Sequence, residues 1–480
     1  MTNIAEIPEL RTEGGVVRPT DPDYDEARAV YNAMIDRHPV LIARCASVAD
    51  VQNALDAGRR AGVPIAIRGG GHNGPGFGTV DGGLVIDLSP MRGVEVDPGR
   101  RTARVQGGAT WGVVDAATHA HGLATPAGII STTGVGGLTL GGGHGYLSRR
   151  HGLTIDNLIE AEVVLADGRV LRASEAEHPE LFWALRGGGG NFGVVVSFTF
   201  ALHPVTTVVC GPTAWPVGAT ADILGWFKDF LPAQGEDLYG FFATMTVPPV
   251  DAFPEAFHLH KACAVMWCYL GDPTDAKDAL APVRAMQPAF DGIGEAPYPA
   301  LQSAFDGLYP PGLQWYWRGD FFNTVAEGAI EAHARFAEEL PSMHSSMHLY
   351  PIDGAPNRVG ADQTAWAYRD ATFSQVIVGV DPDPANAAAL RAWTVDYWEA
   401  THPYSAGGAY VNFMMDDEGG DRVRATYGSN YDRLAQVKAT YDPGNLFRVN
   451  QNIRPAPTTP SGPPRQGRFS RLVRRPWSGG

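Results

Sequence analysis

Residues 65–73 read Ile-Ala-Ile-Arg-Gly-Gly-Gly-His-Asn, a short apolar strand that runs into three glycines and then into His72. Glycine has no Cβ, so three in succession let the backbone approach a phosphate closely, with its N–H groups directed at the anion. The strand before them fixes the position of the loop. An imidazole directly after such a loop lies beside whatever molecule carries the phosphate, and we therefore expect His72 to contact a cofactor.

Composition limits the partners of the chain. The 480 residues are 44% apolar and 19% charged, which is ordinary for a globular protein with a large interior. A formal charge of −15 disfavours nucleic acid and anionic membrane, since both attract basic surfaces. A small organic molecule is the better expectation. The sequence shows no secretory leader and no apolar run of membrane-spanning length, so we expect a cytoplasmic protein; its oligomeric state is unknown.

Cysteine and histidine spacing does not predict a metal site. No two cysteines form a C-x-x-C pair, which makes structural zinc and a disulfide framework poor expectations. The pairs His258/His260 and His344/His348 have metal-like spacing, but no third ligand of a known type accompanies them.

Glycine clusters occur at 69–71, 134–145 and 187–193, all in the first half of the chain. Strand-like and helical segments are mixed between them, which predicts an α+β region. Ser47 and Gly62 are suited to begin and end a helix over Val48–Ala61. The other elements expected here are the strands Val63–Arg68, Leu84–Asp87, Ala103–Gln106, Ala161–Leu165 and Val194–Phe200, and the helix Trp111–His121.

From about Val205 the aromatic residues increase, and helical and strand-like segments alternate, which predicts a separate antiparallel sheet covered by helices. A helix over Asn430–Tyr441 and a turn at 442–445 follow. The Pro-, Ser- and Arg-rich tail after Pro455 is expected to be disordered. The expected helices are Ala221–Leu231, Asp275–Met286, Glu327–Leu340 and Pro384–His402, and the strands are Ala264–Leu270, Trp315–Phe321 and Ser374–Val380.

Two glycine clusters match the spacing G-x-G-x-x-G, beginning at Gly69 and at Gly188. A dinucleotide-binding fingerprint of this kind opens a helix. Here the first match enters the irregular stretch 75–78, and the second enters the strand that begins at Val194. The P-loop, nucleophile-elbow and H-E-x-x-H motifs are missing from the sequence. Any nucleotide would therefore be bound by a different glycine architecture.

Longer motifs supply that architecture. In the N-terminal half they are Arg68-Gly-Gly-Gly-His72-Asn, Asp81-Gly-Gly-Leu-Val-Ile-Asp-Leu-Ser89, the glycine-rich stretch 132–157 and Arg186-Gly-Gly-Gly-Gly-Asn-Phe-Gly193. Near the C-terminus they are Tyr427-Gly-Ser-Asn-Tyr431, Asp442-Pro-Gly-Asn-Leu-Phe447 and Asn450-Gln-Asn-Ile453. Together these motifs resemble the FAD-linked oxidases of the vanillyl-alcohol-oxidase superfamily, and the C-terminal ones indicate the berberine-bridge-enzyme-like branch. The resemblance covers roughly residues 39–207 and 405–455.

The resemblance implies an α+β fold with a two-part FAD-binding domain of the PCMH type. An antiparallel-sheet substrate domain, covered by helices, would be inserted between the two parts. The expected segments are an N-terminal piece at 1–38, the FAD-binding domain at 39–207, the substrate domain at 208–404, the returning C-terminal segment at 405–455 and the tail at 456–480.

The resemblance also implies how FAD is held. The histidine that matches His72 bonds covalently to the 8α-methyl group of the flavin. Many members carry a second link through a cysteine, but that position is Ile130 here, so we predict an 8α-N-histidyl link through His72 only. Singly linked bacterial members include a hydroxynicotine oxidase and polyketide-tailoring oxygenases. The residues expected to bind FAD are Arg68, Gly69, Gly70, Gly71, His72, Asn73, Gly76, Gly128, Ser131, Thr132, Thr133, Gly134, Gly136, Gly137, Leu138, Gly142, Gly143, Gly145, Tyr146, Asp156, Asn157, Gly193, Val194, Val195, Tyr410, Asn412, Asn450, Gln451 and Asn452.

The catalytic base is expected among the tyrosines, because hydride removal from a C–H beside OH or NH requires a group that takes the heteroatom proton. Tyr410 occupies the position near the reactive face of the flavin where the family often has tyrosine, with Asn412 as its polar neighbour. Tyr368, with Arg369, is expected to face it from the inserted domain. Both tyrosines are nearly as well explained as packing residues. His144 is expected to be structural or to line the substrate site.

These expectations describe an FAD-dependent oxidase that takes a hydride from an alcohol or amine carbon and passes the electrons to O₂, giving hydrogen peroxide. Thr132 and Thr133, with Gly134, would lie over the flavin ring and control the approach of O₂. The aromatic-rich inserted region suggests an aromatic or polyketide-like substrate from secondary metabolism. Two alternatives stay open: a flavin-dependent monooxygenase that tailors a secondary metabolite, and a flavin-binding protein that has lost catalysis.

Overall fold

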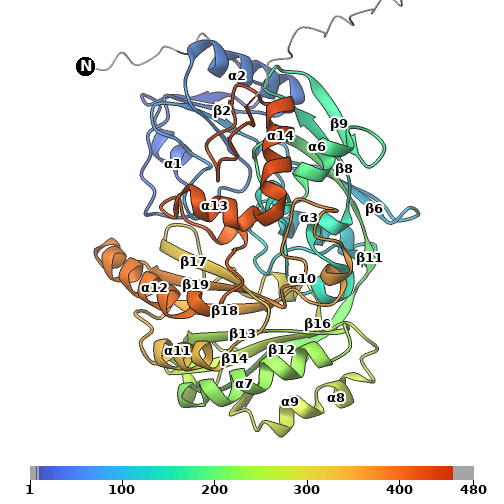
Figure 1. The fold of residues 1–480 in the computed structure, drawn as a ribbon, viewed down its shortest axis with the longest axis vertical. Coiled ribbons are helices and arrows are strands. Elements are labelled where there is room, and N and C mark those ends of the chain that lie inside the picture. Colours follow the sequence, from blue (N-terminus) through green and yellow to red (C-terminus); the bar gives the residue numbers. More distant parts are fainter. Residues whose placement is uncertain (1–6, 8–9, 458–480) are drawn as a thin grey trace, which may run out of the picture.

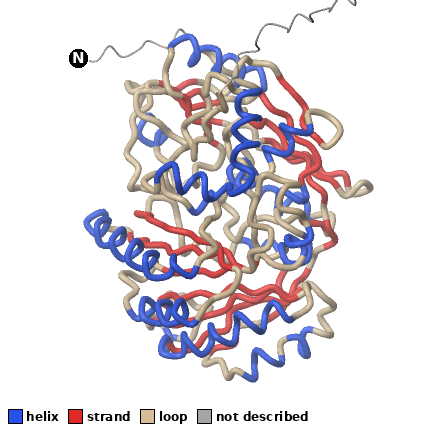
Figure 2. The backbone as a smooth tube through the Cα atoms, viewed as in Figure 1, coloured by secondary structure: helices blue, strands red, loops and turns tan. Residues whose placement is uncertain are grey.

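The computed structural model describes residue 7 and residues 10–457. Most of the tail predicted to be disordered lies outside the described residues. Figures 1 and 2 show two stacked parts: the N-terminal half of the chain lies with the C-terminal helices in one part, and a large sheet with its covering helices forms the other. This mixed α+β arrangement confirms the predicted fold class, whereas the predicted domain boundaries stay predictions.

A small sheet carries the first glycine loop. Its strands β2 (Leu41–Arg44), β4 (Leu84–Asp87) and β3 (Ile65–Arg68) run parallel, and β1 (Val16–Val17) joins β2 antiparallel. Helix α2 (Val48–Ala61) connects β2 to β3 with the predicted caps: the hydroxyl of Ser47 accepts a hydrogen bond from the Asp50 N–H at 3.2 Å, and Gly62 is left-handed at φ +66°. The glycines at 69–71 therefore begin where a buried strand ends.

The second sheet is antiparallel throughout, in the order β5-β6-β10-β8-β9 for the described strands. The glycine run 187–193 enters its central strand β10 and opens no helix, which confirms that the second G-x-G-x-x-G match is not a dinucleotide fingerprint. The strands are β5 (Val94–Asp97), β6 (Thr102–Gln106), β8 (Leu158–Val164), β9 (Val170–Ser174) and β10 (Val194–Ala201), and a short pair is made by β7 (Leu123–Ala124) and β11 (His203–Pro204). The helices of this region are α1 (Tyr24–Arg28), α3 (Trp111–His119), α4 (Val135–Gly141), α5 (Ser148–His151) and α6 (Pro179–Leu185).

The large sheet is also antiparallel, in the order β15-β12-β14-β13-β18-β19-β17 with β16 paired to β12, counting described strands. Helices α7, α11 and α12 pack against one face of it (Figure 1). Along β18, Met347 and Leu349 belong to the core under these helices, while His348 and Tyr350 point to the opposite face, as the two-residue period of a strand requires. The strands are β12 (Thr207–Pro216), β13 (Leu238–Thr246), β14 (Lys261–Tyr269), β15 (Phe290–Asp291), β16 (Gly294–Pro297), β17 (Gln314–Phe322), β18 (Ser346–Pro351) and β19 (Phe373–Asp381), and the helices are α7 (Thr220–Phe230), α10 (Tyr298–Gln302), α11 (Glu327–Glu338) and α12 (Ala387–Thr401).

One predicted helix of this region is wrong. The segment Asp275–Met286 forms two short helices, α8 (Ala276–Ala279) and α9 (Ala281–Ala285), instead of one. Pro282 is the reason, because its ring nitrogen has no hydrogen to donate to a preceding turn and its φ is suited to the first turn of a new helix.

The C-terminal segment returns to the glycine run through a buried cluster. Helices α13 (Gly419–Tyr427) and α14 (Tyr431–Tyr441) lie beside the N-terminal half of the chain in Figure 1. At the end of α14, the fully buried ammonium of Lys438 donates to the Asp442 carboxylate (2.7 Å) and to the carbonyls of Asn191 (2.6 Å) and Phe447 (2.8 Å). The motif at 442–447 is therefore a clamp that holds the C-terminal segment against the glycines at 187–193.

None of the described helices is both long and apolar enough to cross a membrane.

Candidate active site

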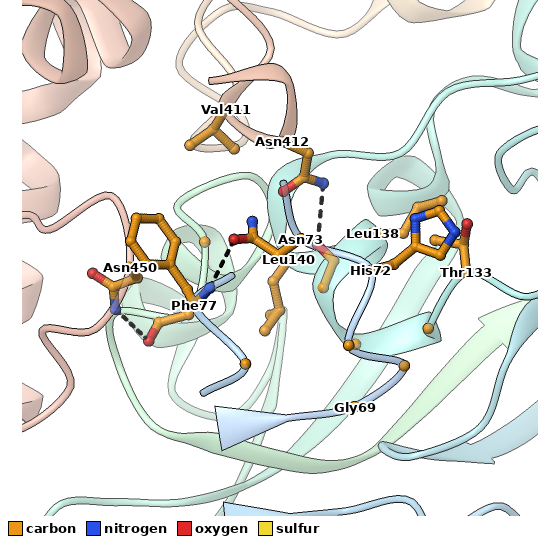
Figure 3. A pocket seen from close by; sticks show the side chains of 18 of the residues that line it. Gly69, His72, Asn73, Phe77, Thr133, Leu138, Leu140, Val411, Asn412 and Asn450 are labelled. Atoms are coloured by element: carbon orange, nitrogen blue, oxygen red, sulfur yellow. Dashed lines mark hydrogen bonds between the residues drawn. The ribbon is translucent and has the colours of Figure 1, made fainter. Parts of the chain in front are cut away.

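A cavity of about 350 Å³ lies between the glycine loops and the face of the large sheet opposite helices α7, α11 and α12, which we call its open face. This volume is within the range of small-molecule sites. Four parts of the chain form its walls: the loop after β3, the glycine-rich start of α4, the run 189–193 with the C-terminal segment, and the strands β17, β18 and β19. Figure 3 shows His72, Asn412 and Asn450 among the side chains that line this cavity from different segments.

His72 is half-buried and lines this cavity. Its ring stacks on Tyr31 with a centroid separation of 3.6 Å, and its Nε2 atom is buried with no hydrogen-bond partner among the described residues. Burial lowers the pKa of His72 to about 4. The imidazole is therefore neutral at ordinary pH and keeps a lone pair, which is the state required of a nucleophile.

The glycines next to His72 bring two loops into direct contact. A Cβ at Gly70 would lie 2.5 Å from the backbone nitrogen of Gly134, so neither side of this contact has room for a side chain. Gly137 and Gly190 differ, because a Cβ on either would meet no atom within 4 Å. Both line the cavity, so their missing side chains leave open a space bounded by backbone, which suits a planar heterocycle joined to phosphate.

Two asparagines lie at the edge of this backbone-lined space between the glycine loops, which we call the cradle. The side-chain amide of Asn412 donates to the Gly137 carbonyl at 3.1 Å, and that of Asn450 donates to the Gly190 carbonyl at 3.0 Å (Figure 3). Asn191 binds the same segment, with Oδ1 accepting from the Ile453 N–H at 3.0 Å. The C-terminal segment thus fixes the positions of both glycine loops.

The hydroxyl of Tyr410 is held at the cavity by two donors. The amide of Asn412 donates to it at 2.7 Å and the backbone N–H of Gly143 at 3.1 Å. Burial raises the pKa of Tyr410 to about 12, although both hydrogen bonds favour the phenolate and oppose this shift. Tyr410 precedes a 3₁₀ turn, Val411–Phe413, and does not belong to a strand. Its hydroxyl is therefore held in one position beside the glycine loops.

The structure brings most of the predicted cofactor residues to one cavity and excludes the rest. Those that line it are Arg68, Gly69, Gly70, Gly71, His72, Asn73, Gly128, Thr133, Gly134, Gly136, Gly137, Leu138, Gly193, Val195, Tyr410, Asn412, Asn450 and Gln451. Those that do not are Gly76, Ser131, Thr132, Gly142, Gly143, Gly145, Tyr146, Asp156, Asn157, Val194 and Asn452. Ile130, where the resemblance places the cysteine of a second link, also lines the cavity.

Local contacts explain why the other predicted residues lie outside the cavity. Val194 points away because Val195, its neighbour in β10, points in. Ser131 bonds Asp306, and Tyr146 packs edge-on against Tyr239. The Asn157 amide donates to the His151 and Leu153 carbonyls. Gly142 is crowded by the ring of Trp366.

The expectation that Tyr368 and Arg369 face Tyr410 is wrong. The Tyr368 hydroxyl donates to the carbonyl of Ala425 at 2.8 Å, and its ring stacks on Phe321. Arg369 forms a buried, two-pronged ion pair with Asp156 at 2.7 and 2.8 Å. The Asp156 carboxylate therefore holds an arginine of the inserted region, and neither of these side chains reaches the cavity.

Sequence reasoning missed the polar residues of β18. Ser346, His348 and Tyr350 line the cavity, and His348 had been weighed only as half of a metal-spaced pair. Their two-residue alternation is the signal that could have found them. His144 lines the cavity as expected, and the alternating Trp315 and Trp317 of β17 supply pocket wall.

Two family models match the chain: the FAD binding domain at residues 39–174, and "Berberine and berberine like" at residues 409–454. The FAD-linked oxidoreductase YgaK of Bacillus subtilis is 33% identical, covering 92% of this chain and 97% of that protein. The (R)-6-hydroxynicotine oxidase of Paenarthrobacter nicotinovorans is 30% identical, covering 93% and 98%.

Solved structures agree with these relatives. The crystal structure of 6-hydroxy-D-nicotine oxidase from Arthrobacter nicotinovorans matches with a TM-score of 0.83 and 28% identity, covering 94% of this chain and all of that one. The xylooligosaccharide oxidase from Myceliophthora thermophila matches with a TM-score of 0.79 and 25% identity, covering 92% and 97%. The cradle has the form that FAD requires, and the chain belongs to the FAD-linked oxidoreductases with a berberine-bridge-like C-terminal segment.

Proposed function

We propose that the chain is an oxidase that converts an alcohol or amine carbon of a small organic molecule to the carbonyl or imine. The carbon loses a hydride and its heteroatom loses a proton; O₂ takes up both and leaves as hydrogen peroxide. Bound FAD supplies the hydride acceptor and the site of reaction with O₂. We further propose that FAD is tethered through His72 alone.

The observation that carries this proposal is the placement of Tyr410. Its hydroxyl oxygen receives hydrogen bonds from Asn412 and Gly143, and its own hydrogen has only a long contact with the Leu138 carbonyl, at 3.5 Å, which a substrate atom in the cavity can replace. When the proton is lost, the same two donors stabilise the phenolate. Tyr410 can therefore orient a substrate hydroxyl or amine and accept its proton.

The single tether is supported by the residues at the two link positions. His72 has a buried, unpartnered Nε2 and a neutral ring, whereas Ile130 has no nucleophilic atom. The described cysteines Cys45, Cys210, Cys263 and Cys268 are buried and do not line the cavity.

Related enzymes support an oxidation and leave the substrate open. One is named as an oxidase of (R)-6-hydroxynicotine, and another, 29% identical and from Gibberella zeae, as an oxidase of chitooligosaccharides. The cavity of this chain is lined mainly by aromatic and aliphatic side chains outside the glycine loops. This lining favours an aromatic or polyketide-like alcohol over a sugar.

The test is a screen of aromatic alcohols and amines for peroxide release, followed by anaerobic stopped-flow measurement of flavin reduction with the best substrate. Tyr410→Phe should slow reduction at least 100-fold, in line with the loss of a general base, and leave reoxidation by O₂ nearly unchanged. Tyr368→Phe is the matched control, because its hydroxyl bonds Ala425 away from the cavity, and reduction should stay within about twofold.

Other outcomes would replace the proposal. Equal reduction rates in wild type and Tyr410→Phe would move the base elsewhere. Incorporation of ¹⁸O from ¹⁸O₂ into the product would identify a monooxygenase. A photoreduced flavin that air does not reoxidise, together with no turnover on any substrate, would identify a flavin-binding protein without catalysis.

A further inference from the structure

The open face of β18 places a hydrogen-bonded pair in an otherwise apolar wall. His348 and Tyr350 both line the cavity, and the Nδ1 atom of His348 lies 2.6 Å from the Tyr350 hydroxyl. Neighbouring strands surround the pair with Phe241 of β13 and with Val376 and Val378 of β19. The Nε2 atom of His348 bonds no described residue, so this pair has hydrogen-bonding capacity that the protein itself does not use.

The pair offers the same number of donors and acceptors whichever of its two atoms carries the shared proton. If the Tyr350 O–H donates to Nδ1, the pair presents the Nε2–H of His348 as a donor and the Tyr350 oxygen as an acceptor. If Nδ1–H donates to Tyr350, the pair presents Nε2 as an acceptor and the Tyr350 O–H as a donor. One donor and one acceptor are offered in both cases, and a hydroxyl group, which can donate or accept, satisfies either of them.

The cavity around the pair, as far as the chain is described, offers no unpaired charge to an ionic substrate. Among the described residues, those that line the cavity include no Asp, Glu or Lys. Arg68 is the lining residue with a permanent charge, and its guanidinium is bound to the Asp87 carboxylate at 2.8 Å and to the Ala27 carbonyl at 2.6 Å. Burial lowers the pKa of His348 to about 4 and that of His144 to about 3, so both rings are neutral. An ammonium group would lose its hydration here without gaining a partner charge.

One side chain, that of His144, separates the pair from Tyr410, the proposed base. His144 packs between the two sites, with its ring centroid 4.8 Å from that of Tyr410 and 5.1 Å from that of Tyr350. Phe413 contacts both tyrosines from another side, at 4.8 and 6.0 Å. Tyr410 and the His348–Tyr350 pair therefore line one cavity on either side of the His144 ring, where one bound molecule can contact both.

From these contacts we infer that His348 and Tyr350 anchor a neutral hydroxyl of an aromatic substrate, at the end remote from the carbon that is oxidised. The inference rests on the proposed function and narrows its substrate class to uncharged hydroxylated aromatics. Cationic amines in their charged form are expected to bind more weakly, because the described lining of the cavity offers them no partner charge.

Binding to the flavin-loaded protein tests this without knowledge of the natural substrate. The probes are 4-ethylphenol, ethylbenzene and benzyltrimethylammonium, and the readout is the change each causes in the visible absorption of the flavin. The phenol should bind about tenfold more tightly than the hydrocarbon, as one satisfied hydrogen-bonding group allows, and the cation should bind more weakly than either. His348→Phe and Tyr350→Phe should each remove most of the preference for the phenol. His348→Gln should restore part of it, because an amide also offers one donor and one acceptor.

His344→Phe is the matched control, since His344 precedes β18 and does not line the cavity; it should keep the full preference. An unchanged preference in both His348→Phe and Tyr350→Phe would overturn the inference, as would binding of the cation as tight as that of the phenol. Flavin content and melting temperature show whether each variant is folded, and if His348→Phe does not fold, Tyr350→Phe decides. Because no turnover is measured, failure of this preference is distinct from failure of the oxidase assay.

Discussion

Tyr31 stacks on His72 with ring centroids 3.6 Å apart and planes inclined by 23°. Tyr31 is itself fixed: its N–H donates to the Gly71 carbonyl at 3.1 Å, and its hydroxyl donates to the carbonyl of Tyr309. The next residue, Asn32, bonds the backbone of Gly74 and Trp315. A segment that precedes the FAD-binding match thus holds the imidazole in one orientation.

Removing this stack should slow covalent attachment of the flavin. In Tyr31→Ala the His72 ring gains rotational freedom and water, so we expect a covalently loaded fraction several-fold below that of wild type after expression. Tyr31→Phe keeps the ring and should load nearly fully. The fraction is measured as flavin retained in an acid-precipitated pellet, and equal retention in Tyr31→Ala would show that the stack is dispensable.

The two kinds of glycine in the cradle should respond differently to alanine. Gly70→Ala places a methyl group 2.5 Å from the Gly134 backbone, so both loops must move, and we expect a loss of about 1–3 kcal/mol in unfolding free energy together with poor FAD retention. Gly137→Ala lies in helix α4 with open space around its Cβ, so the apoprotein should gain up to about 1 kcal/mol while FAD binding weakens. Chemical denaturation with and without FAD separates the two effects.

The pKa of Tyr410 sets the sign of the pH dependence. Burial raises it to about 12, so at lower pH the hydroxyl is protonated and the phenolate is the minor form. The phenolate fraction, and with it the flavin reduction rate, should rise about tenfold per pH unit below that pKa. Stopped-flow reduction of wild type between neutral and mildly alkaline pH should show this slope without a plateau, and Tyr410→Phe should be flat. A plateau near neutral pH in wild type would assign the proton to another group.

The main effect of Arg369→Ala should be on the stability of the fold and not on catalysis. Its ion pair with Asp156 is buried on both sides, so the variant leaves a buried carboxylate unpaired at a cost of about 3–5 kcal/mol. Arg358→Ala removes the mostly exposed pair with Glu236 and should cost under about 1 kcal/mol. Thermal unfolding of the two variants makes the comparison. If Arg369→Ala instead lost much of its activity with unchanged stability, Arg369 would have a role in the active site.

Local chemistry explains what the sequence could predict. The caps of α2 and the strand-to-loop change at Gly69 depend on neighbours in the chain, and both were predicted. The glycine motifs bring their loops to one cavity, and most of the residues predicted to bind FAD line it.

Long-range contacts explain what it could not. Arg369 turns to Asp156 and Tyr368 to Ala425, and irregular segments give no period from which such directions can be read. Tyr31 reaches His72 from a segment outside the recognised motifs. His348 lines the cavity only because β18 pairs with β13 and β19, which no local pattern of the sequence specifies.

The central claim is that His72 holds the flavin, and one measurement addresses it directly. The purified protein is precipitated with acid, digested, and its peptides are analysed by mass spectrometry. The account predicts a yellow pellet and a flavin adduct on the peptide that contains His72, with none on the peptide that contains Ile130; in His72→Ala the flavin should appear in the supernatant. A colourless wild-type pellet, or an adduct on any other residue, would contradict it.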